Sequence, residues 1–287
     1  MDYSDLTGQT KDKLTSCFGQ LRLRGISENY EELNRLAIKE SLSYEEYLLE
    51  LLEQECDYRR DKRISRLLKE SRLPLEKRME NFDSGRVGIK VNQQVKALLE
   101  GSFIDRSENV LLFGNPGSGK THLLCGIGQK LIGDGRRVLF SNCSLLVQEL
   151  LLAKKELLLP KKLKKLSRYD VLILDDIGYV KQSREEMDVL FNLLSERYER
   201  GSVMLSSNLP FSRWDEVFKD PMLTAAVIDR LVHHSVLIEL NVESYRMQHA
   251  LSGRDLPGRG GGGEKSKSQG DNGDRCIGEE KKIRSKE

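Results

Sequence analysis

Cysteines, aromatic residues and long apolar runs are all scarce in this sequence. Only five of its 287 residues are cysteines, and because they are scattered and form no C-x-x-C pair, neither a disulfide framework nor a zinc site is expected. The four histidines do not combine with them at zinc spacing. No apolar run approaches the roughly eighteen residues of a membrane span, and the acidic, polar first ten residues exclude a signal peptide. We therefore expect reduced thiols and a cytoplasmic protein without membrane contacts.

An excess of one charge is also absent, because the formal net charge is only +2. Total charge therefore says little about binding partners, and local clusters carry more information. The length leaves room for one large domain and a smaller one, with ample core.

The clearest motif is a glycine-rich loop at 114–121, which fits G-x-x-x-x-G-K-[ST] and directly follows the apolar run 110–113. Its glycines let several backbone N–H groups approach phosphate oxygens without a Cβ in the way. Lys120 can reach the β and γ phosphates, and the Thr121 hydroxyl can ligate Mg²⁺. The sequence therefore predicts ATP and Mg²⁺ as cofactors, with the nucleotide held by Gly114, Asn115, Pro116, Gly117, Ser118, Gly119, Lys120, Thr121 and His122.

From about residue 109, short apolar runs alternate with segments of helix length. Runs of three to five apolar residues fit parallel strands that are buried on both faces, and helices between them give right-handed crossovers. The pattern predicts a doubly wound α/β domain over residues 109–250, with strands at 110–113, 138–140, 171–174, 203–205 and 236–240.

A pair of acidic residues completes the expected site. Asp175 and Asp176 directly follow the run 171–174, at the end of a predicted buried strand. We expect Asp175 to join the Mg²⁺ shell through water and Asp176 to act as the general base that polarises the attacking water. Two adjacent acids favour hydrolysis over transfer to a small acceptor, and no second motif indicates an acceptor pocket. A turn after a core strand is the alternative.

Two further residues are candidates for the phosphate chemistry. Asn208 follows the run 203–205, where its amide could hold water in line with the γ-phosphate, or it could be a turn residue before Pro210. Arg230 lies on an apparent helix and is a candidate arginine finger, although an arginine after an aspartate is often a surface ion pair. His233 and His234 are expected in packing or polar contacts.

The first 80 residues are expected to form a small helical module. Ser43 and Glu46 have the spacing of a capping box, and apolar residues from Tyr44 to Leu52 share one stripe of the helix that follows. Residues 59–78 then carry nine basic and three acidic side chains. This face is either ordinary solvated surface or a contact for DNA phosphates. Its candidate DNA-binding residues are Arg59, Arg63, Arg66 and Lys69.

A second basic cluster lies in the segment KKELLLPKKLKKLSR at 154–168. Aromatic residues occur only at the edges of the two clusters, at Tyr58 and Tyr169. Few aromatic side chains are therefore available to stack on the bases of single-stranded DNA. Duplex DNA, held by its backbone with little sequence preference, is therefore favoured. The candidates in the second cluster are Lys161, Lys162, Lys164 and Lys165.

Two segments lie outside the module and the ATPase domain. Residues 81–108 are expected to be a linker and the start of the ATPase domain. Residues 251–287 are glycine-rich, charged and almost free of large apolar side chains, so they are expected to be disordered. A basic tail that binds nucleic acid is the alternative for this segment.

Several longer blocks occur together: NVLLFGNPGSGKTHL, RYDVLILDDIGY, LFNLLSERYERGS, SSNLPFSRWDEVFKDP, DRLVHHS and ESYR. In this order and spacing they resemble the IstB family, the ATPase helpers of insertion-sequence transposases, and its relatives the DnaC-type helicase loaders. The resemblance covers roughly residues 14–248 and includes LNRLAIKESLSYEEYLLELLEQE in the helical module. The blocks together are far more specific than the phosphate loop alone.

The resemblance implies an AAA+ ATPase with sheet order 5-1-4-3-2, in which the strand before Asn208 lies between those of the phosphate loop and Asp175. Asn208 would then be the first sensor. Arg230 matches the family's arginine finger, which acts in trans on the nucleotide of a neighbouring subunit. Arg246 matches the second-sensor arginine of the loaders, although the lid that carries it is short here. Many relatives have glutamate at the position of Asp176, so slower hydrolysis is expected.

The resemblance and the charge pattern together give a functional hypothesis. ATP binding would assemble identical subunits and align their basic faces, so that weak phosphate contacts add up. We expect a homo-oligomer that binds target DNA and recruits or stimulates a transposase. A helicase loader that binds single-stranded DNA is the alternative, and a metabolic kinase with a phosphate loop is a third hypothesis.

Overall fold

The centre of the protein is a parallel sheet of five strands in the order β2-β3-β4-β1-β5. The computed structural model describes residues 3–178, 183–215, 220–242 and 244–245. The order is the predicted one read from the other edge, and each predicted apolar run lies within one strand. The α/β prediction is therefore confirmed. The strands are β1 (Asn109–Gly114), β2 (Val138–Asn142), β3 (Val171–Ile177), β4 (Ser202–Ser207) and β5 (Ser235–Leu240).

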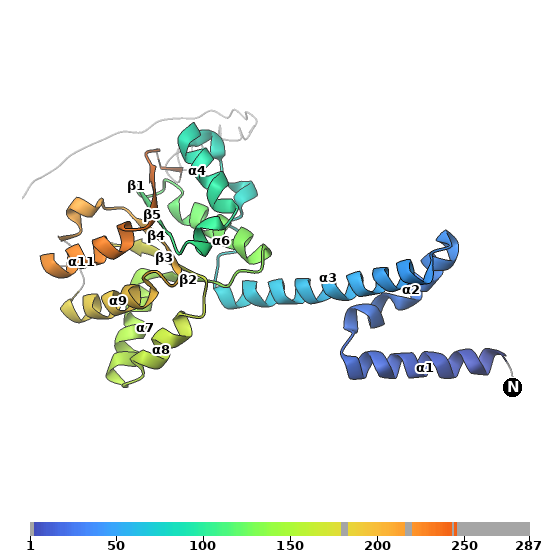
Figure 1. Ribbon diagram of the computed structural model, residues 1–287. Coiled ribbons are helices and arrows are strands. Elements are labelled where there is room, and N and C mark those ends of the chain that lie inside the picture. The colour runs from blue at the N-terminus through green and yellow to red at the C-terminus, as the bar shows by residue number, and fades with distance from the viewer. Residues whose placement is uncertain (1–2, 179–182, 216–219, 243, 246–287) are drawn as a thin grey trace, which may run out of the picture.

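Helices cover both faces of this sheet (Figure 1). Alternate residues of a strand point to opposite faces, so in β1 Leu111 and Phe113 pack against one layer and Val110 and Leu112 against the other. This burial on both faces explains why the strands are continuous apolar runs. The first layer contains α7 (Cys143–Lys155), α8 (Leu159–Leu166), α9 (Arg184–Arg197) and α11 (Pro221–Val232), and the second contains α4 (Ile89–Leu99), α5 (Ser102–Asp105) and α6 (Lys120–Gly133).

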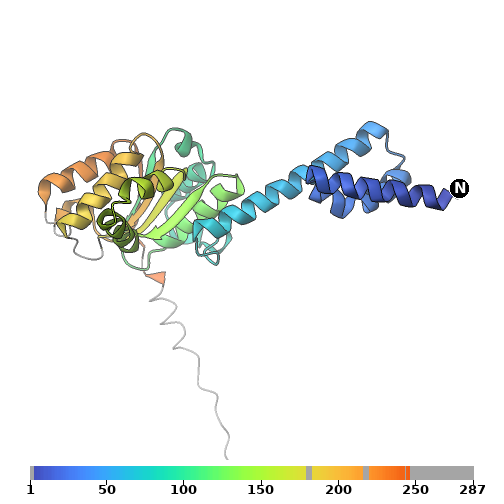
Figure 2. The ribbon, with the colours of Figure 1, turned by 90° about the horizontal axis from the view of Figure 1, so that it is seen from below.

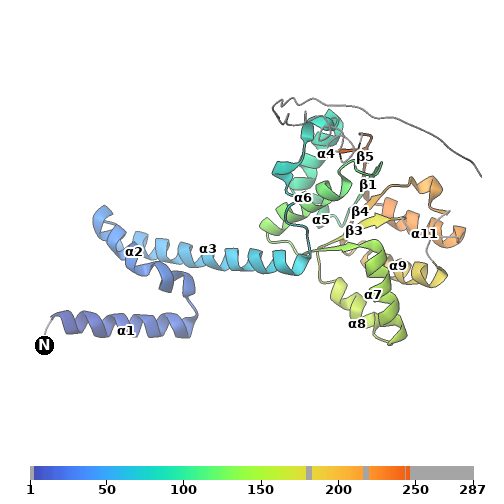
Figure 3. The same ribbon diagram turned by 180° about the vertical axis from the view of Figure 1, so that it is seen from behind.

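The N-terminal helices are α1 (Tyr3–Leu21), α2 (Arg24–Glu40) and α3 (Tyr44–Ser71). Figure 1 shows α3 projecting from the sheet domain with α1 and α2 near its far end, and the views from below and behind agree (Figures 2 and 3). The predicted capping box forms at the start of α3 between Ser43 and Glu46. The buried carboxylate of Glu55 accepts the backbone N–H of Gly25 over 2.7 Å, which fixes the first turn of α2 against α3.

The last turns of α3 belong to the core of the sheet domain. Leu67, and Leu73 just after the helix, are buried in the layer that contains α4, α5 and α6. At the other end of α3, Tyr44, Leu48 and Leu52 are exposed, so this side of the predicted apolar stripe has no cover in the described residues. One continuous helix therefore joins the helical module to the core of the sheet domain.

Residues 79–108 pack closely against the helix that follows the phosphate loop. They include η1 (Met79–Asn81) and η2 (Ser84–Arg86). A Cβ on Gly126 of α6 would lie 2.9 Å from the Met79 sulfur, so this approach requires glycine. The predicted limits at 80, 108 and 250 stay predictions, and the segment 251–287 lies outside the described residues. Among the described helices, none is long and apolar enough to cross a membrane.

Candidate nucleotide site

The glycine-rich loop joins the end of β1 to the start of α6, as the motif predicts. Gly117 and Gly119 adopt φ values of 80° and 97°, in the left-handed region that favours glycine. The Lys120 ammonium group donates hydrogen bonds to the carbonyl oxygens of Gly114 at 2.8 Å and Asn115 at 2.9 Å. The loop therefore curls around its own lysine and forms a concave backbone surface suited to phosphate oxygens.

A hydroxyl and a carboxylate lie together beside this loop. Thr121 Oγ1 donates a hydrogen bond to Asp175 Oδ1 over 3.0 Å, and Asp175 is buried at the end of β3. Mg²⁺ prefers hard oxygen ligands and is bound in proteins by one or two such groups together with substrate phosphates and water. The pair at Thr121 and Asp175 fits that requirement, and their assignment as metal-binding residues stays a prediction.

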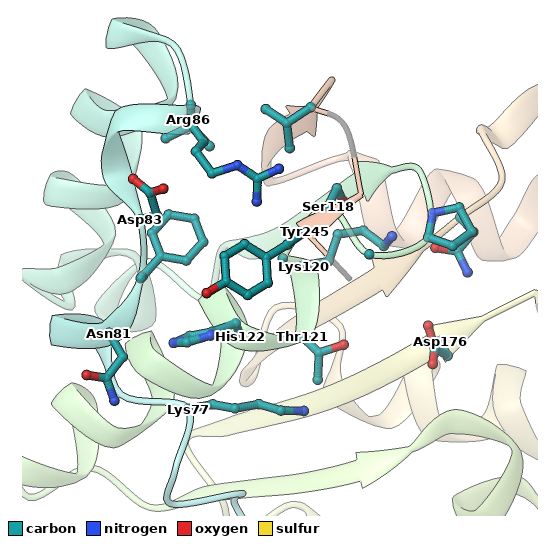
Figure 4. A pocket seen from close by; sticks show the side chains of 17 residues that line it. Lys77, Asn81, Asp83, Arg86, Ser118, Lys120, Thr121, His122, Asp176 and Tyr245 are labelled. Carbon is teal, nitrogen blue, oxygen red and sulfur yellow. The ribbon is translucent and has the colours of Figure 1, made fainter. Parts of the chain in front are cut away.

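Asp176 reaches the pocket because β3 is irregular at this point. The register between β3 and β4 shifts between Leu174 and Ile177, and Asp176 has a φ of 58°. A bulge of this kind redirects one side chain out of the strand's alternation. Figure 4 shows Asp176 at the opposite side of the cavity from Asn81 and Asp83. The position suits a base for a water near the phosphates, and that role stays a prediction.

Asn208 lies just after β4, between the strand of the phosphate loop and the strand of the acids. It lines the same cavity as Lys120 and Asp176. Its side-chain oxygen is buried and has no hydrogen-bond partner among the described residues. Buried polar atoms are normally paired, so this amide is suited to hold a water or a phosphate oxygen.

A wall of the cavity was not identified from the sequence. The cavity has a volume of about 440 Å³, and residues of the expected linker form one side of it. Phe82 lies edge-on to the His122 ring, with centroids 5.7 Å apart, and the Arg86 guanidinium lies 5.2 Å from the centroid of the Tyr245 ring. Figure 4 shows Arg86 and Tyr245 side by side over the loop. This wall offers aromatic and apolar surface beside the phosphate loop.

Arg230 lies at the opposite end of the sheet from the phosphate loop. The Asn109 side-chain amide, at the start of β1, donates to the carbonyl oxygen of Arg230 over 3.4 Å. The guanidinium donates to Ala226 O over 3.1 Å and lies 4.3 Å from the centroid of the Phe191 ring. The structure therefore does not bring Arg230 together with Lys120. Arg246 lies outside the described residues.

The two histidines after α11 take part in polar contacts. His233 Nδ1 and the Tyr198 hydroxyl are 2.8 Å apart, and the two rings stack. Glu199 lies beside both histidines, and one potential ligand atom from each of the three residues lies within 4.8 Å of the others. All three are exposed. Sequence reasoning did not pair the histidines with a carboxylate, because Glu199 belongs to a distant segment.

The predicted DNA-binding residues of α3 are partly used by the fold. Arg59 donates to the Glu55 carboxylate over 2.7 Å and to Arg22 O over 3.3 Å. Arg63 donates to Gly135 O over 3.2 Å in the sheet domain. The backbone-directed bonds of both arginines stabilise the position of α3, so a phosphate contact would be a second role for them. Arg66 Nε and Glu70 Oε1 form a long ion pair over 4.0 Å, and Lys69 is exposed.

The second basic cluster lies on α8. Lys162 pairs with Glu149 of α7 over 2.5 Å, and the same carboxylate accepts from Arg72 over 3.1 Å. The hydrogen bonds from Lys162 and then Arg72 hold the pKa of Glu149 below its ordinary value. Glu149 therefore links the end of α3 to α8. Three of the four predicted residues on α8 are exposed, namely Lys161, Lys164 and Lys165.

Comparison with known proteins identifies the family. A family model described as IstB-like ATP binding protein matches residues 16–253. An insertion-sequence ATP-binding protein of Sinorhizobium fredii is 41% identical over 248 residues, which cover 86% of this chain and 83% of the relative. An ATP-binding protein of insertion sequence IS21 from Pseudomonas aeruginosa is 41% identical over 237 residues, which cover 82% of this chain and 89% of the relative.

A solved structure gives the same fold at lower identity. The DnaC helicase loader superposes with a TM-score of 0.50 and 16% sequence identity, over 59% of this chain and 98% of the loader. This likeness shows the fold alone. The family match spans the helical module as well as the sheet domain, and with the two relatives it confirms the resemblance stated from the sequence blocks. The chain belongs to the IstB-like ATP-binding proteins of insertion sequences.

Proposed function

We propose that this protein is a Mg²⁺-dependent ATPase that assembles on duplex DNA in its ATP-bound state and supports a transposase. The position of Arg230 carries the assembly step. Its backbone contacts Asn109 at the start of β1, whereas the phosphate loop begins at Gly114, the end of that strand. Five residue steps of about 3.3 Å separate the two ends by roughly 17 Å. Arg230 is therefore suited to the nucleotide of another copy.

The chemistry of the proposed hydrolysis follows from the groups around the cavity. The loop amides and Lys120 bind the phosphates, while Thr121 and Asp175 hold Mg²⁺, which neutralises phosphate charge when bound. Asn208 orients a water, and Asp176 accepts its proton as the oxygen attacks the γ-phosphorus. The bond between that phosphorus and the bridging oxygen breaks, and ADP leaves. An arginine from the neighbour stabilises the charge that develops.

Assembly converts weak DNA contacts into a strong one. Lys161, Lys164 and Lys165 are exposed on α8, and each copy in an assembly would present the same set. Linked binding sites raise the effective concentration of every further contact. Phosphate contacts carry no base information, so this mode of binding suits a protein that must act on unrelated target sequences.

Sedimentation tests this proposal directly. The protein is spun with and without a non-hydrolysable ATP analogue, together with duplex or single-stranded DNA of unrelated sequence. Large complexes that require both the analogue and duplex DNA are the expected result. Lys120→Ala is the control variant: it loses the ammonium group of the phosphate loop, so it should neither bind the analogue nor assemble.

The other outcomes would overturn the proposal in defined ways. A preference for single strands, or assembly only after a replicative helicase is added, would make the protein a helicase loader. If the protein binds the analogue but DNA does not change its sedimentation, assembly on DNA is not part of its function.

A further inference from the structure

The turn between α7 and α8 contains a leucine in an unfavourable conformation. Leu157 has a φ of 59°. Its N–H donates to Lys154 O over 3.1 Å, and the Leu158 N–H donates to Ala153 O over 2.7 Å. These bonds end α7 in a left-handed cap, a position that usually carries glycine because a side chain is strained there.

Packing does not compensate for this strain. The Leu157 side chain is 88% exposed, more than Leu145 at 65% and Leu152 at 58%, the exposed leucines of α7. Glycine would relax the backbone and remove apolar surface from water. Neither the backbone conformation nor the core accounts for a leucine at this position, and a contact outside the chain would account for it.

The surroundings of Leu157 restrict what that contact is. Lys155, Lys161, Lys164 and Lys165 flank it in the sequence and are exposed. On α8, Leu159, Leu163 and Leu166 pack on the core, so its lysine face points away from the sheet domain. Glu156 is the one acidic residue in the segment 154–168, so Leu157 is an apolar tip in a mainly cationic segment, which complements a polyanion with an apolar interior. Stacked base pairs between two phosphate chains have that character, and proteins enter minor grooves by inserting leucine between base steps.

We propose that Leu157 is a wedge that enters the minor groove of duplex DNA and partly unstacks one base step. Lys161, Lys164 and Lys165 hold the flanking phosphates, which offsets the cost of unstacking. The inference rests on the proposed function, because it specifies how the assembled protein meets its DNA. In an assembly every copy presents one wedge, so DNA steps that are easily deformed are preferred without base readout.

Fluorescence of 2-aminopurine in a duplex reports unstacking and tests the wedge. In the presence of a non-hydrolysable ATP analogue, the wild-type protein should raise the fluorescence. Leu157→Gly should abolish most of that rise while duplex affinity stays within about threefold, because lysine contacts with phosphate dominate affinity. Leu145→Ala, which removes another exposed leucine of the same helix pair, is the matched control and should behave as wild type. The melting temperature of Leu157→Gly should not fall.

Each further outcome separates the wedge from the proposed function. Normal unstacking by Leu157→Gly, or wild-type assembly on duplex DNA without any rise, overturns the wedge and leaves the assembly proposal standing. A wild-type protein that does not assemble on duplex DNA overturns the proposed function itself. If Leu157→Gly instead weakens self-association without DNA, or abolishes binding to anionic lipid vesicles, the leucine contacts a second copy or a membrane surface and the wedge is overturned.

Discussion

Ser206 Oγ donates a hydrogen bond to Asp175 Oδ1 over 2.6 Å and accepts one from the Asp176 backbone N–H over 2.9 Å. One buried hydroxyl on β4 therefore fixes both acids of the candidate site. It orients the carboxylate beside Thr121 and holds the bulge that turns Asp176 toward the cavity.

Ser206→Ala should lower ATP hydrolysis while the protein still binds ATP. Loss of a hydrogen bond that positions a metal-binding carboxylate typically costs on the order of tenfold to a hundredfold. Ser207→Ala is the matched control, because the Ser207 hydroxyl bonds the carbonyl oxygens of Ile177 and Leu209 and neither acid. Turnover and ATP affinity are measured for both variants. Equal losses of turnover in the two variants would mean that the Ser206 hydroxyl contributes only to folding.

Asp176→Asn should bind ATP normally and hydrolyse it on the order of a hundredfold or more slowly, as expected for loss of a general base. Asp176→Glu keeps a carboxylate in the same bulge and should retain more activity than the amide variant. Single-turnover hydrolysis separates the chemical step from binding. Normal hydrolysis by Asp176→Asn would show that another group activates the water.

Mixing two inactive variants tests the trans role of Arg230. Arg230→Ala keeps Asp176, and Asp176→Asn keeps the arginine, so a mixed interface can contain one intact copy of each. Random mixing in equal amounts should restore about a quarter of the wild-type rate, because each site meets its neighbour's arginine across a head-to-tail interface. Each variant alone is the control. No recovery on mixing would contradict an arginine supplied by the neighbour.

Replacing Lys161, Lys164 and Lys165 by alanine should weaken duplex binding and flatten its salt dependence. Each lost phosphate contact lowers the slope of log affinity against log salt by about 0.9. Lys162→Ala is the comparison: this lysine is paired with Glu149, so its loss should change the slope less and the stability of the α7–α8 pair more. An unaltered slope in the triple variant would mean that the lysines of α8 are ordinary solvated surface and do not contact DNA phosphates.

Arg197 is expected to stabilise the fold rather than take part in catalysis. It is 3% exposed and donates hydrogen bonds to carbonyl oxygens of Leu166, Tyr169, Asp170 and Ser202, and burial lowers its pKa to about 10. Arg197→Met should cost at least about 3 kcal/mol in the free energy of unfolding, because it leaves several buried carbonyls unpaired. Urea unfolding measures this loss. A change below 1 kcal/mol would mean that water replaces the guanidinium.

The sheet and the phosphate loop could be predicted because their signals are local. A glycine-rich loop between an apolar run and a helix is a strong indication of phosphate binding. The apolar runs themselves indicate strands that are buried on both faces. The wall formed by Phe82, Arg86 and Tyr245 has no such signal. Tyr245 lies far from Phe82 and Arg86 in the sequence, and it meets Arg86 only because the chain returns beside the loop.

Charge patterns were less informative than the apolar ones for a physical reason. Arg59 and Lys161 look alike in the sequence and both are exposed, yet Arg59 donates to Glu55 and to a backbone carbonyl, whereas Lys161 has no such partner among the described residues. Whether a cation is used by the fold depends on acceptors from distant segments. The strained conformation of Leu157 is equally hidden, because the residue type alone would never suggest a left-handed cap.

The length of the continuous helix α3 determines how far the helical module lies from the sheet domain. Its 28 residues contain neither glycine nor proline, so nothing in them favours a kink, and at 1.5 Å per residue they span about 42 Å. The rise of B-form DNA is about 3.4 Å per base pair, so this length corresponds to about a dozen base pairs. The reach of the helical module from the nucleotide domain is therefore set by the number of residues in α3. Inserting a single residue would change both that distance and the direction in which the module faces.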